Sequence, residues 1–464
     1  MDKIKSFLTK LNNMSPAAKA SFWFVVSNVV LKGISFITTP IFTRLLDVAD
    51  YGISSVFVTW EGVISIFATL SLAGGVYNVA MTKYEKDVET LTSSLIGLSA
   101  LSSILVYVVC IGINAIFPQL FGLSVGYLIF MWIQTFTNIS TTFWLMRKRY
   151  TYDYKKVIAY TFTNAILSPV VAIIAVRLVE DNKAYAKVIG SGLWGIIVGV
   201  VIMAMLIYKG KKLYHKEYWK YALKFNVPLL PHYLSQVMLN SADKLMLDFF
   251  MGSAAAGLYS IAHSITGVVS IITQSINSSL IPYTLQSIKQ GTVKKLYSVV
   301  LGCSTLVAVI CEMIVLFARE GILIFATEEY MDAVWFVAPL AFSVQIAFVT
   351  GLVGNILFYY EKTKEMSTIT IVTALINVVL NYLGIKMFGF VAVGYATLIT
   401  GFVHFFLTYF TVKKYEKNLD EIINLKYLLL IFVVFAGLMC YGLVFWNNFI
   451  MKILLVFGIL IFED

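Results

Sequence analysis

Long apolar segments separated by short polar loops run along the whole sequence. About 20 apolar residues are needed for a helix to cross the hydrocarbon core of a bilayer. Segments of that kind are predicted over residues 20–42, 51–80, 91–117, 122–146, 155–178, 186–208, 222–250, 255–284, 295–318, 333–358, 366–388, 391–412 and 427–446, with a shorter one over 449–462. The pattern predicts an all-α polytopic membrane protein with 12–14 transmembrane helices.

The segments fall into two sets of six, followed by the additional C-terminal helices. We expect residues 1–208 to form an N-terminal six-helix lobe, 209–221 a cytoplasmic linker, 222–425 a C-terminal six-helix lobe, and 426–464 one or two more helices. Because six is an even number, both lobes have the same orientation. They are predicted to be parallel repeats related by a pseudo-twofold axis along the membrane normal.

A weak internal match supports the repeat. A shift of 205 residues places Glu61–Ile66 on Thr266–Ile271, with four of six letters identical, and places Gly52 on Gly257. A short apolar match can arise from composition alone. The position of both copies in equivalent helices therefore carries more weight than the letters.

Two neighbouring segments near the middle of the chain each carry a stripe of polar residues. The first stripe contains His232, Gln236, Asn240 and Asp243, and the second contains Tyr259, His263, Thr266, Ser270, Gln274 and Asn277. Spacings of three and four place each set on one helical face. Since unpaired polar groups are costly in hydrocarbon, the stripes are predicted to line a wet cavity.

The charge distribution indicates membrane topology rather than nucleic-acid binding. The net charge is +10, and 26 of the 35 lysines and arginines fall in the N-terminal tail and in loops on the same side of the membrane. This asymmetry predicts a cytoplasmic N terminus. The loops Arg147–Lys156 and Lys209–Lys224 alternate bases with aromatic residues, and the longer one could be an amphipathic helix on the inner leaflet. Specific lipid recognition and ordinary positive-inside loops both remain open.

Several charged residues lie inside the apolar segments, where each costs on the order of 2.5–3.5 kcal/mol by insertion scales. Lys32 and Glu61 are predicted at matching depth on consecutive antiparallel helices, which allows a contact. Asp243 and Lys244 point about 100° apart, and Lys244 could face a cavity or extend to the interface. Glu312 is nearer a helix end and is expected to be interfacial.

Signatures of soluble enzymes are missing from the sequence. We find no phosphate loop, no HExxH zinc pair and no GxSxG elbow, and the four cysteines all lie in apolar segments. The sequence therefore predicts no enzymatic activity, no cofactor and no metal site. His263 is expected to be a hydrogen-bonded core histidine somewhat more than a ligand-binding one.

Five pieces of the chain, taken in order, resemble a known family. They are the apolar Ser21–Thr43 after a basic tail, then Arg44–Gly52, Phe225–Pro231, Asp243–Lys244 and Phe250–Tyr259. Together they resemble the Wzx-type O-antigen and polysaccharide repeat-unit flippases of the multidrug/oligosaccharidyl-lipid/polysaccharide (MOP) exporter superfamily. The resemblance covers essentially the whole chain in segment order.

This resemblance implies two six-helix bundles around a cavity lined by the first, second, seventh and eighth helices. It implies a substrate, an oligosaccharide on undecaprenyl pyrophosphate, that moves from the inner to the outer leaflet of the bacterial cytoplasmic membrane for O-antigen, capsule or other surface polysaccharide. Membrane lipids, a glycan polymerase and a chain-length protein are implied partners. The candidate residues are Lys32, Lys244 and Arg44 for the pyrophosphate, Asn28, Gln236, Asn240, His263, Gln274 and Asn277 for the glycan, and Glu61 and Asp243 for coupling. Related flippases carry more basic residues in the cavity than this chain offers.

Three other functions fit the sequence less well. A multidrug exporter of the same superfamily would expel amphipathic cations, which Lys32 and Lys244 repel. A glycan polymerase or ligase is expected to carry large outward loops, whereas the longest here is near Arg319–Asp332. A major-facilitator sugar porter fits the helix count, but Lys83–Val88 lacks the signature of that family.

Overall fold

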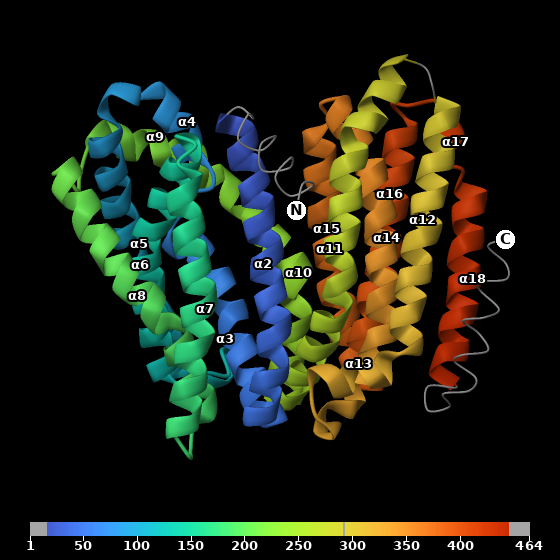
Figure 1. Cartoon of the computed structure of the whole chain (residues 1–464), viewed down its shortest axis with the longest axis horizontal. Helices are drawn as coiled ribbons and strands as arrows, with labels where there is room; N and C mark the ends of the chain where they lie inside the picture. The colour runs from blue at the N-terminus through green and yellow to red at the C-terminus, as the bar shows by residue number, and fades with distance from the viewer. Residues whose placement is uncertain (1–15, 291–292, 445–464) are drawn as a thin grey trace, which may run out of the picture. The chain divides into compact units, whose positions relative to one another are not determined.

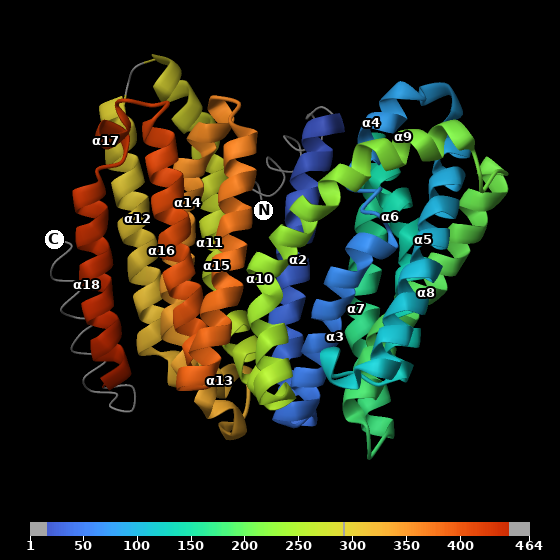
Figure 2. The ribbon, with the colours of Figure 1, turned by 180° about the vertical axis from the view of Figure 1, so that it is seen from behind.

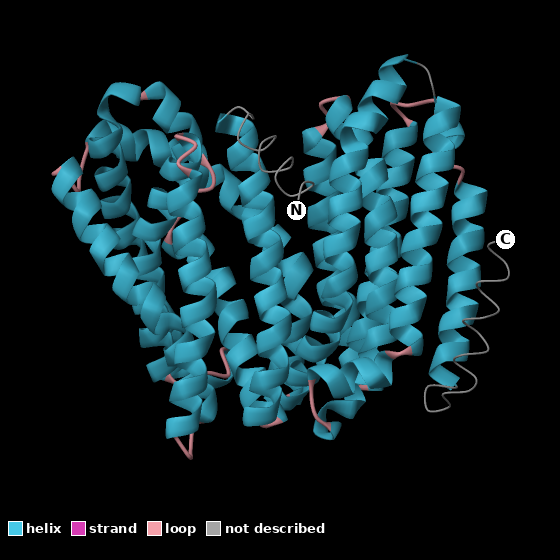
Figure 3. Cartoon of the chain, viewed as in Figure 1, coloured by secondary structure: helices cyan, strands magenta, loops and turns pink. Residues whose placement is uncertain are grey.

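The structure of the chain is a computed structural model that describes residues 16–290 and 293–444. A few side chains inside these helices, among them those of Asn28 and Lys32, are outside the description. Every regular element in the described ranges is a helix (Figure 3). The prediction of an all-α polytopic membrane protein is confirmed.

Ten described helices are long and apolar enough to cross a membrane. They are α3 (Val48–Ala68), α5 (Val88–Ile116), α7 (Tyr154–Leu178), α8 (Lys183–Gly210), α11 (Ser253–Gln290), α12 (Val293–Leu316), α14 (Val334–Tyr359), α15 (Thr363–Phe388), α16 (Ala392–Lys413) and α18 (Leu425–Val444). Three more helices have 30, 26 and 22 residues: α2 (Pro16–Leu45), α6 (Val125–Tyr150) and α10 (Leu230–Met251). The segment predicted over 449–462 lies outside the described residues.

The chain folds into two compact units. Unit 1 consists of Met1–Leu46 and Ile53–Leu234, and unit 2 of Asp47–Gly52 and Ser235–Asp464. The division falls inside two helices, since the first turn of α3 belongs to unit 2 and the first turn of α10 to unit 1. Each unit is described by itself below.

Unit 1 is built around α5, α6, α7 and α8, with α2 packed against α7 (Figure 1). Close helix crossings depend on glycine. A Cβ on Gly190 would lie 2.5 Å from the Cα of Ala172, and one on Gly199 would lie 2.8 Å from the carbonyl oxygen of Thr137. Small residues allow helix backbones to approach in this way and are typical of membrane helix contacts.

Unit 2 is organised around α14, against which α11, α12 and α16 pack. Its apolar core includes Ile346, Val349 and Val353, each fully buried. Glu312 on α12, expected at an interface, is buried to 1% exposure, and no described residue hydrogen-bonds either of its carboxylate oxygens. That expectation was wrong because α18 packs against α12. The position of Glu312 along its own helix does not reveal this neighbour.

The second predicted segment, over 51–80, is not one continuous helix. Helix α3 ends at Ala68, Leu70 and Ser71 adopt left-handed backbone with φ of 51° and 48°, and α4 (Val76–Lys83) follows. The fully buried Asn226 bridges the break: its Nδ2 donates to the Leu70 carbonyl at 2.7 Å, and its Oδ1 accepts from the Val76 N–H at 3.0 Å. A distant side chain thus satisfies backbone groups that the helix break exposes.

Helix α9 (Lys216–Asn226) begins inside the predicted linker, so the second half of the Lys209–Lys224 loop is helical. It runs beside α4 and α5 (Figure 2). The Trp219 indole donates to the Ser94 carbonyl at 2.9 Å, and the Tyr218 hydroxyl donates to Asp87 at 2.6 Å. A short 3-10 turn, Val227–Leu229, which contains Pro228, then separates α9 from α10. The aromatic side of α9 is therefore used for packing within unit 1.

Gly75 offers a test of the bridged break. An added Cβ would lie 2.4 Å from Asn226 Oδ1 and 2.9 Å from the Tyr233 hydroxyl. We expect Gly75→Ala to lower the free energy of unfolding by about 1–3 kcal/mol, because the Asn226 amide must move off buried backbone partners. Thermal unfolding of the purified protein in detergent measures this. The neighbouring Gly74→Ala is the control, since its nearest atom is 4.0 Å away; equal melting temperatures would contradict the prediction.

Candidate functional site

Asp243 on α10 accepts three side-chain hydrogen bonds. Its Oδ2 accepts from the Tyr259 hydroxyl at 2.6 Å and the Thr397 hydroxyl at 2.7 Å, and its Oδ1 accepts from Asn381 Nδ2 at 2.5 Å. Asn381 Nδ2 also donates to Asn377 at 3.1 Å. The side chain of Asp243 is 2% exposed. It therefore ties α10 to α11, α15 and α16 inside unit 2.

This burial corrects part of the stripe prediction. Asp243 was expected to face a wet cavity with Gln236 and Asn240, and instead it faces the interior of the unit. Its partners Asn381 and Thr397 lie 138 and 154 residues further along the chain. Helical spacing predicts which residues share a face, but not which neighbouring helix covers one end of that face.

Two other residues of the α10 stripe are accessible. Gln236 and Asn240 are exposed, with Asn240 Nδ2 donating to the Gln236 carbonyl at 2.7 Å, and Lys244 is half-buried. Amides exposed within an apolar helix are costly in lipid, because hydrocarbon offers them no partner. Their exposure fits the prediction that this face of α10 is wet.

The α11 stripe divides in a similar way. His263 and Gln274 are exposed, whereas Tyr259 and Thr266 are buried. Asn277 is half-buried and accepts from Asn355 Nδ2 on α14 at 2.8 Å. The expectation that His263 is a core histidine was wrong, because its side chain is exposed, although it lies one turn after the buried Tyr259 on the same helical face.

The candidate site residues of unit 1 lie on α2 and α3. Glu61 on α3 is half-buried, and within the described ranges no hydrogen bond or ion pair to its carboxylate occurs. Arg44, near the end of α2, donates to the Pro40 carbonyl at 2.7 Å and is exposed. Lys32 and Asn28 lie on α2, with side chains outside the description. The predicted contact between Lys32 and Glu61 stays a prediction.

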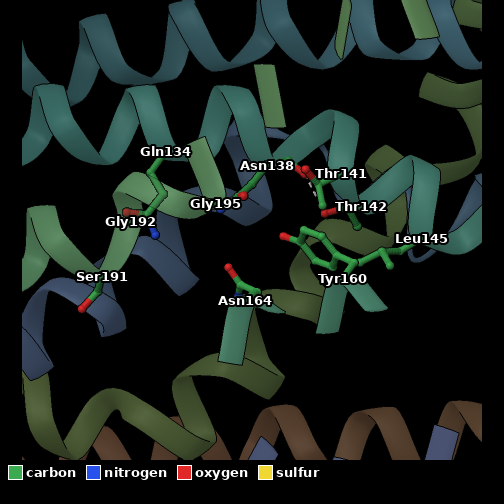
Figure 4. Close-up of a pocket in the computed structure, with 10 residues that line it drawn as sticks. All are labelled: Gln134, Asn138, Thr141, Thr142, Leu145, Tyr160, Asn164, Ser191, Gly192 and Gly195. Carbon is green, nitrogen blue, oxygen red and sulfur yellow. Dashed lines mark hydrogen bonds between the residues drawn. The ribbon is translucent and has the colours of Figure 1, made fainter. Parts of the chain in front are cut away.

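A polar pocket lies between α6, α7 and α8 of unit 1 (Figure 4). Its volume is about 270 Å³. The residues that line it, called the α6–α8 pocket below, are Gln134, Asn138, Thr141, Thr142, Leu145, Tyr160, Asn164, Ser191, Gly192 and Gly195. None of these residues is charged.

The two glycines of α8 make room for the amides of the pocket. A Cβ on Gly195 would lie 3.7 Å from Asn138 Oδ1 and 3.8 Å from Asn164 Oδ1, and one on Gly192 would lie 2.7 Å from Gln134 Oε1. Gln134 Oε1 is buried without a hydrogen-bond partner among the described residues. The sequence did carry a signal for this pocket, since Gln134, Asn138 and Thr141 are spaced by four and three residues and so share one face of α6.

Three of the five basic residues in the loop after α6 pair with two carboxylates of the protein. Arg147 pairs with Glu89 at 2.7 Å, and Lys148 and Lys156 pair with Asp153 at 3.0 and 3.3 Å. Partial burial opposes ionisation of Asp153, but the hydrogen bonds and charges of the two lysines outweigh it and hold the pKa of Asp153 below its ordinary value. The pairing favours an ordinary positive-inside loop over specific lipid recognition.

Metal-ligand residues do not gather in the described ranges, where no group of three His, Cys, Asp or Glu side chains could hold an ion. The site residues are instead amides, hydroxyls and a few single charges at membrane depth. Such groups can bind a polar solute by hydrogen bonds.

Known proteins share this fold. The lipid II flippase MurJ, in an inward closed conformation, matches with a TM-score of 0.61 and 13% identity over 93% of this chain and 99% of its own. An inward-facing multidrug resistance MATE family transporter of the MOP superfamily matches with a TM-score of 0.62 and 14% identity over 84% of this chain and 95% of its own. At these identities the likeness concerns the fold.

Relatives in sequence point in the same direction. A Haemophilus influenzae protein described as Lsg locus putative protein 1 is 24% identical over 86% of this chain and 99% of its own length. An uncharacterized membrane protein of the same organism is 23% identical over 77% of this chain and 88% of its own. Residues 17–288 match the family described as polysaccharide biosynthesis protein. That match spans more than half of the chain, so the protein belongs to the polysaccharide biosynthesis protein family and has the fold of the MOP superfamily exporters.

Proposed function

We propose that the protein is a flippase that moves an oligosaccharide on undecaprenyl pyrophosphate from the inner to the outer leaflet of a bacterial cytoplasmic membrane, for O-antigen, capsule or another surface polysaccharide. The observation that carries the proposal is the exposed polar face of α10 and α11 at membrane depth, in a chain of the polysaccharide biosynthesis family. A glycan needs such amide and hydroxyl partners on its way through the membrane. The excess of basic residues in one set of loops supports a cytoplasmic N terminus.

The different parts of the proposed substrate need different types of residue. A pyrophosphate needs cations, and α2 places Lys32 within its apolar span, 16 residues after Pro16 and so roughly 24 Å along a helix that rises 1.5 Å per residue. The glycan needs hydrogen-bonding partners, and Gln236, Asn240, His263 and Gln274 are exposed. The polyprenyl tail is apolar and can remain in lipid.

Lys32 and Glu61 supply a mechanism that belongs to this proposal. In the empty protein the two charges neutralise each other, because an unpaired charge at this depth is costly. When the pyrophosphate arrives, Lys32 turns to it, and the carboxylate left beside an anion is stabilised by taking up a proton. Export of an anion from an inside-negative cell is downhill by about 2.3 kcal/mol per charge and 100 mV.

A multidrug exporter is the second candidate, favoured by the similar fold of the MATE transporter. The lysines Lys32 and Lys244 count against it, since an amphipathic cation would have to bind beside them. Deletion of the gene separates the two functions. A flippase deletion accumulates glycan-loaded undecaprenyl pyrophosphate at the inner face, whereas an exporter deletion changes drug sensitivity and leaves surface glycan unchanged.

Lys32 provides the residue-level test. Lys32→Ala is expected to lower surface glycan by about tenfold or more, because a hydrogen bond to a charged group contributes about 1.5–3 kcal/mol. Lys32→Arg should keep part of the activity, and Glu61→Gln should bind substrate but turn over slowly. Lys386→Ala, which removes an exposed lysine at the end of α15, is the control. Normal glycan export by Lys32→Ala would remove the anion site, and a normal rate in Glu61→Gln would remove the proton step.

A further inference from the structure

We propose that the α6–α8 pocket of unit 1 is a binding site for one uncharged sugar ring of the transported glycan. The inference rests on the proposed function for the identity of the glycan. The pocket itself, its chemistry and its test stand on unit 1 alone.

The lining of the pocket selects against other kinds of ligand. An inorganic cation would need carboxylates and an anion would need lysine or arginine, and no charged residue lines the pocket. An apolar molecule would find mainly Leu145 and the ring of Tyr160. What remains is a neutral ligand with many hydroxyls, for which three amides and several hydroxyls supply both donors and acceptors.

The depth of the pocket makes these polar groups costly without a ligand. Asn138, Asn164 and Gly195 lie about 20, 15 and 18 Å from the starts of α6, α7 and α8, at 1.5 Å per residue. Each position is near the middle of its helix, where backbone and side chains have no lipid partner. A buried polar atom without a partner costs about 1–3 kcal/mol, and Gln134 Oε1 is such an atom. A sugar hydroxyl that donates to it would remove this cost.

The size of the pocket fits a single ring. Its volume of about 270 Å³ is just below the roughly 300–1,000 Å³ of sites for drug-sized ligands. Figure 4 shows the side chains of Asn164 and Tyr160 on one side of the pocket and those of Gln134 and Asn138 on the other. Gly195 carries no side chain into the space between the two asparagine oxygens. The lack of a side chain at Gly195 therefore leaves an opening that is surrounded by amides.

Substitutions can fill the pocket or remove its hydrogen-bonding groups with little change to the fold. A methyl group in Gly195→Ala would make ordinary contacts at 3.7 and 3.8 Å with the two asparagine oxygens. Asn138→Leu and Asn164→Leu keep the side-chain shape and remove the hydrogen bonds. Gly112→Ala on α5 is the matched control, since nothing lies within 4 Å of its added Cβ.

Saturation-transfer NMR on the purified full-length protein in detergent tests the proposal, with glucose, galactose, mannose and N-acetylglucosamine as probes. We expect at least one sugar to give a signal with wild type and the Gly112→Ala variant. The signal should fall about tenfold in the Asn138→Leu and Asn164→Leu variants, as loss of a buried hydrogen bond to the ligand implies. It should also fall in the Gly195→Ala variant, because the added methyl group occupies the space between the two asparagine oxygens.

Two results would overturn the sugar site. One is that none of the four sugars binds wild type, and the other is that sugar signals are the same in wild type and in the three pocket variants. Neither result bears on whether deletion of the gene traps glycan at the inner face. Conversely, a deletion without effect on lipid-linked glycan would end the flippase proposal and leave the measured sugar binding as it is.

Discussion

The Gly52→Ala variant is expected to fold poorly, with about 3 kcal/mol lost from the free energy of unfolding, at the upper end of the usual cost of overpacking. The first turn of α3 crosses the first turn of α11 within unit 2. A Cβ on Gly52 would lie 1.7 Å from the Ser253 carbonyl oxygen, and one on Gly257 would lie 2.4 Å from the Val48 carbonyl oxygen. Both clashes are with backbone, which cannot rotate away as a flexible side chain can.

Each glycine has a matched control ten residues further along the same helix. Nothing lies within 4 Å of a Cβ on Gly62 of α3 or on Gly267 of α11. Gly62→Ala and Gly267→Ala should therefore keep the melting temperature of wild type, whereas Gly52→Ala and Gly257→Ala should lower it or abolish folded protein. Equal melting temperatures within either pair would show that the two helices can separate at no cost.

The Asp243→Leu variant is expected to lose about 3 kcal/mol of stability. Leucine has nearly the same shape, but it leaves the hydroxyls of Tyr259 and Thr397 and the amide of Asn381 without their acceptor. A buried donor without a partner costs about 1–3 kcal/mol, and the two hydroxyls can turn to other acceptors, which reduces the sum. Thermal unfolding in detergent measures the loss.

The Asp243→Asn variant distinguishes a structural role of Asp243 from a role in coupling. Asparagine keeps an oxygen for Asn381 and can donate its amide to the hydroxyl of Tyr259 or Thr397, each of which also accepts. We expect a melting temperature close to wild type and a clear reduction of surface glycan, because the negative charge is gone while the hydrogen-bond network stays. Wild-type glycan export by this variant would assign Asp243 a purely structural role.

The sequence determined the class of the protein because insertion into a bilayer depends on local composition. A helix satisfies its own backbone, so a run of about 20 apolar residues is enough to predict a span. The same reasoning predicted the polar faces of α10 and α11, since helical spacing depends on no distant residue. The shift that aligned Gly52 with Gly257 was also visible in the sequence, and in the structure these two glycines mark the crossing of α3 and α11.

Other features were decided only by tertiary contacts. The end of α3 at Ala68 depends on Asn226, and the burial of Asp243 depends on Asn381 and Thr397, all far away in the sequence. The α6–α8 pocket exists because three helices leave a space in front of Gly195. The spacing along one helix gives the direction of each side chain about that helix's own axis. The neighbouring helix decides whether that side chain faces a core, a pocket or a wet surface. Long-range packing places this neighbour, and no local sequence pattern predicts it.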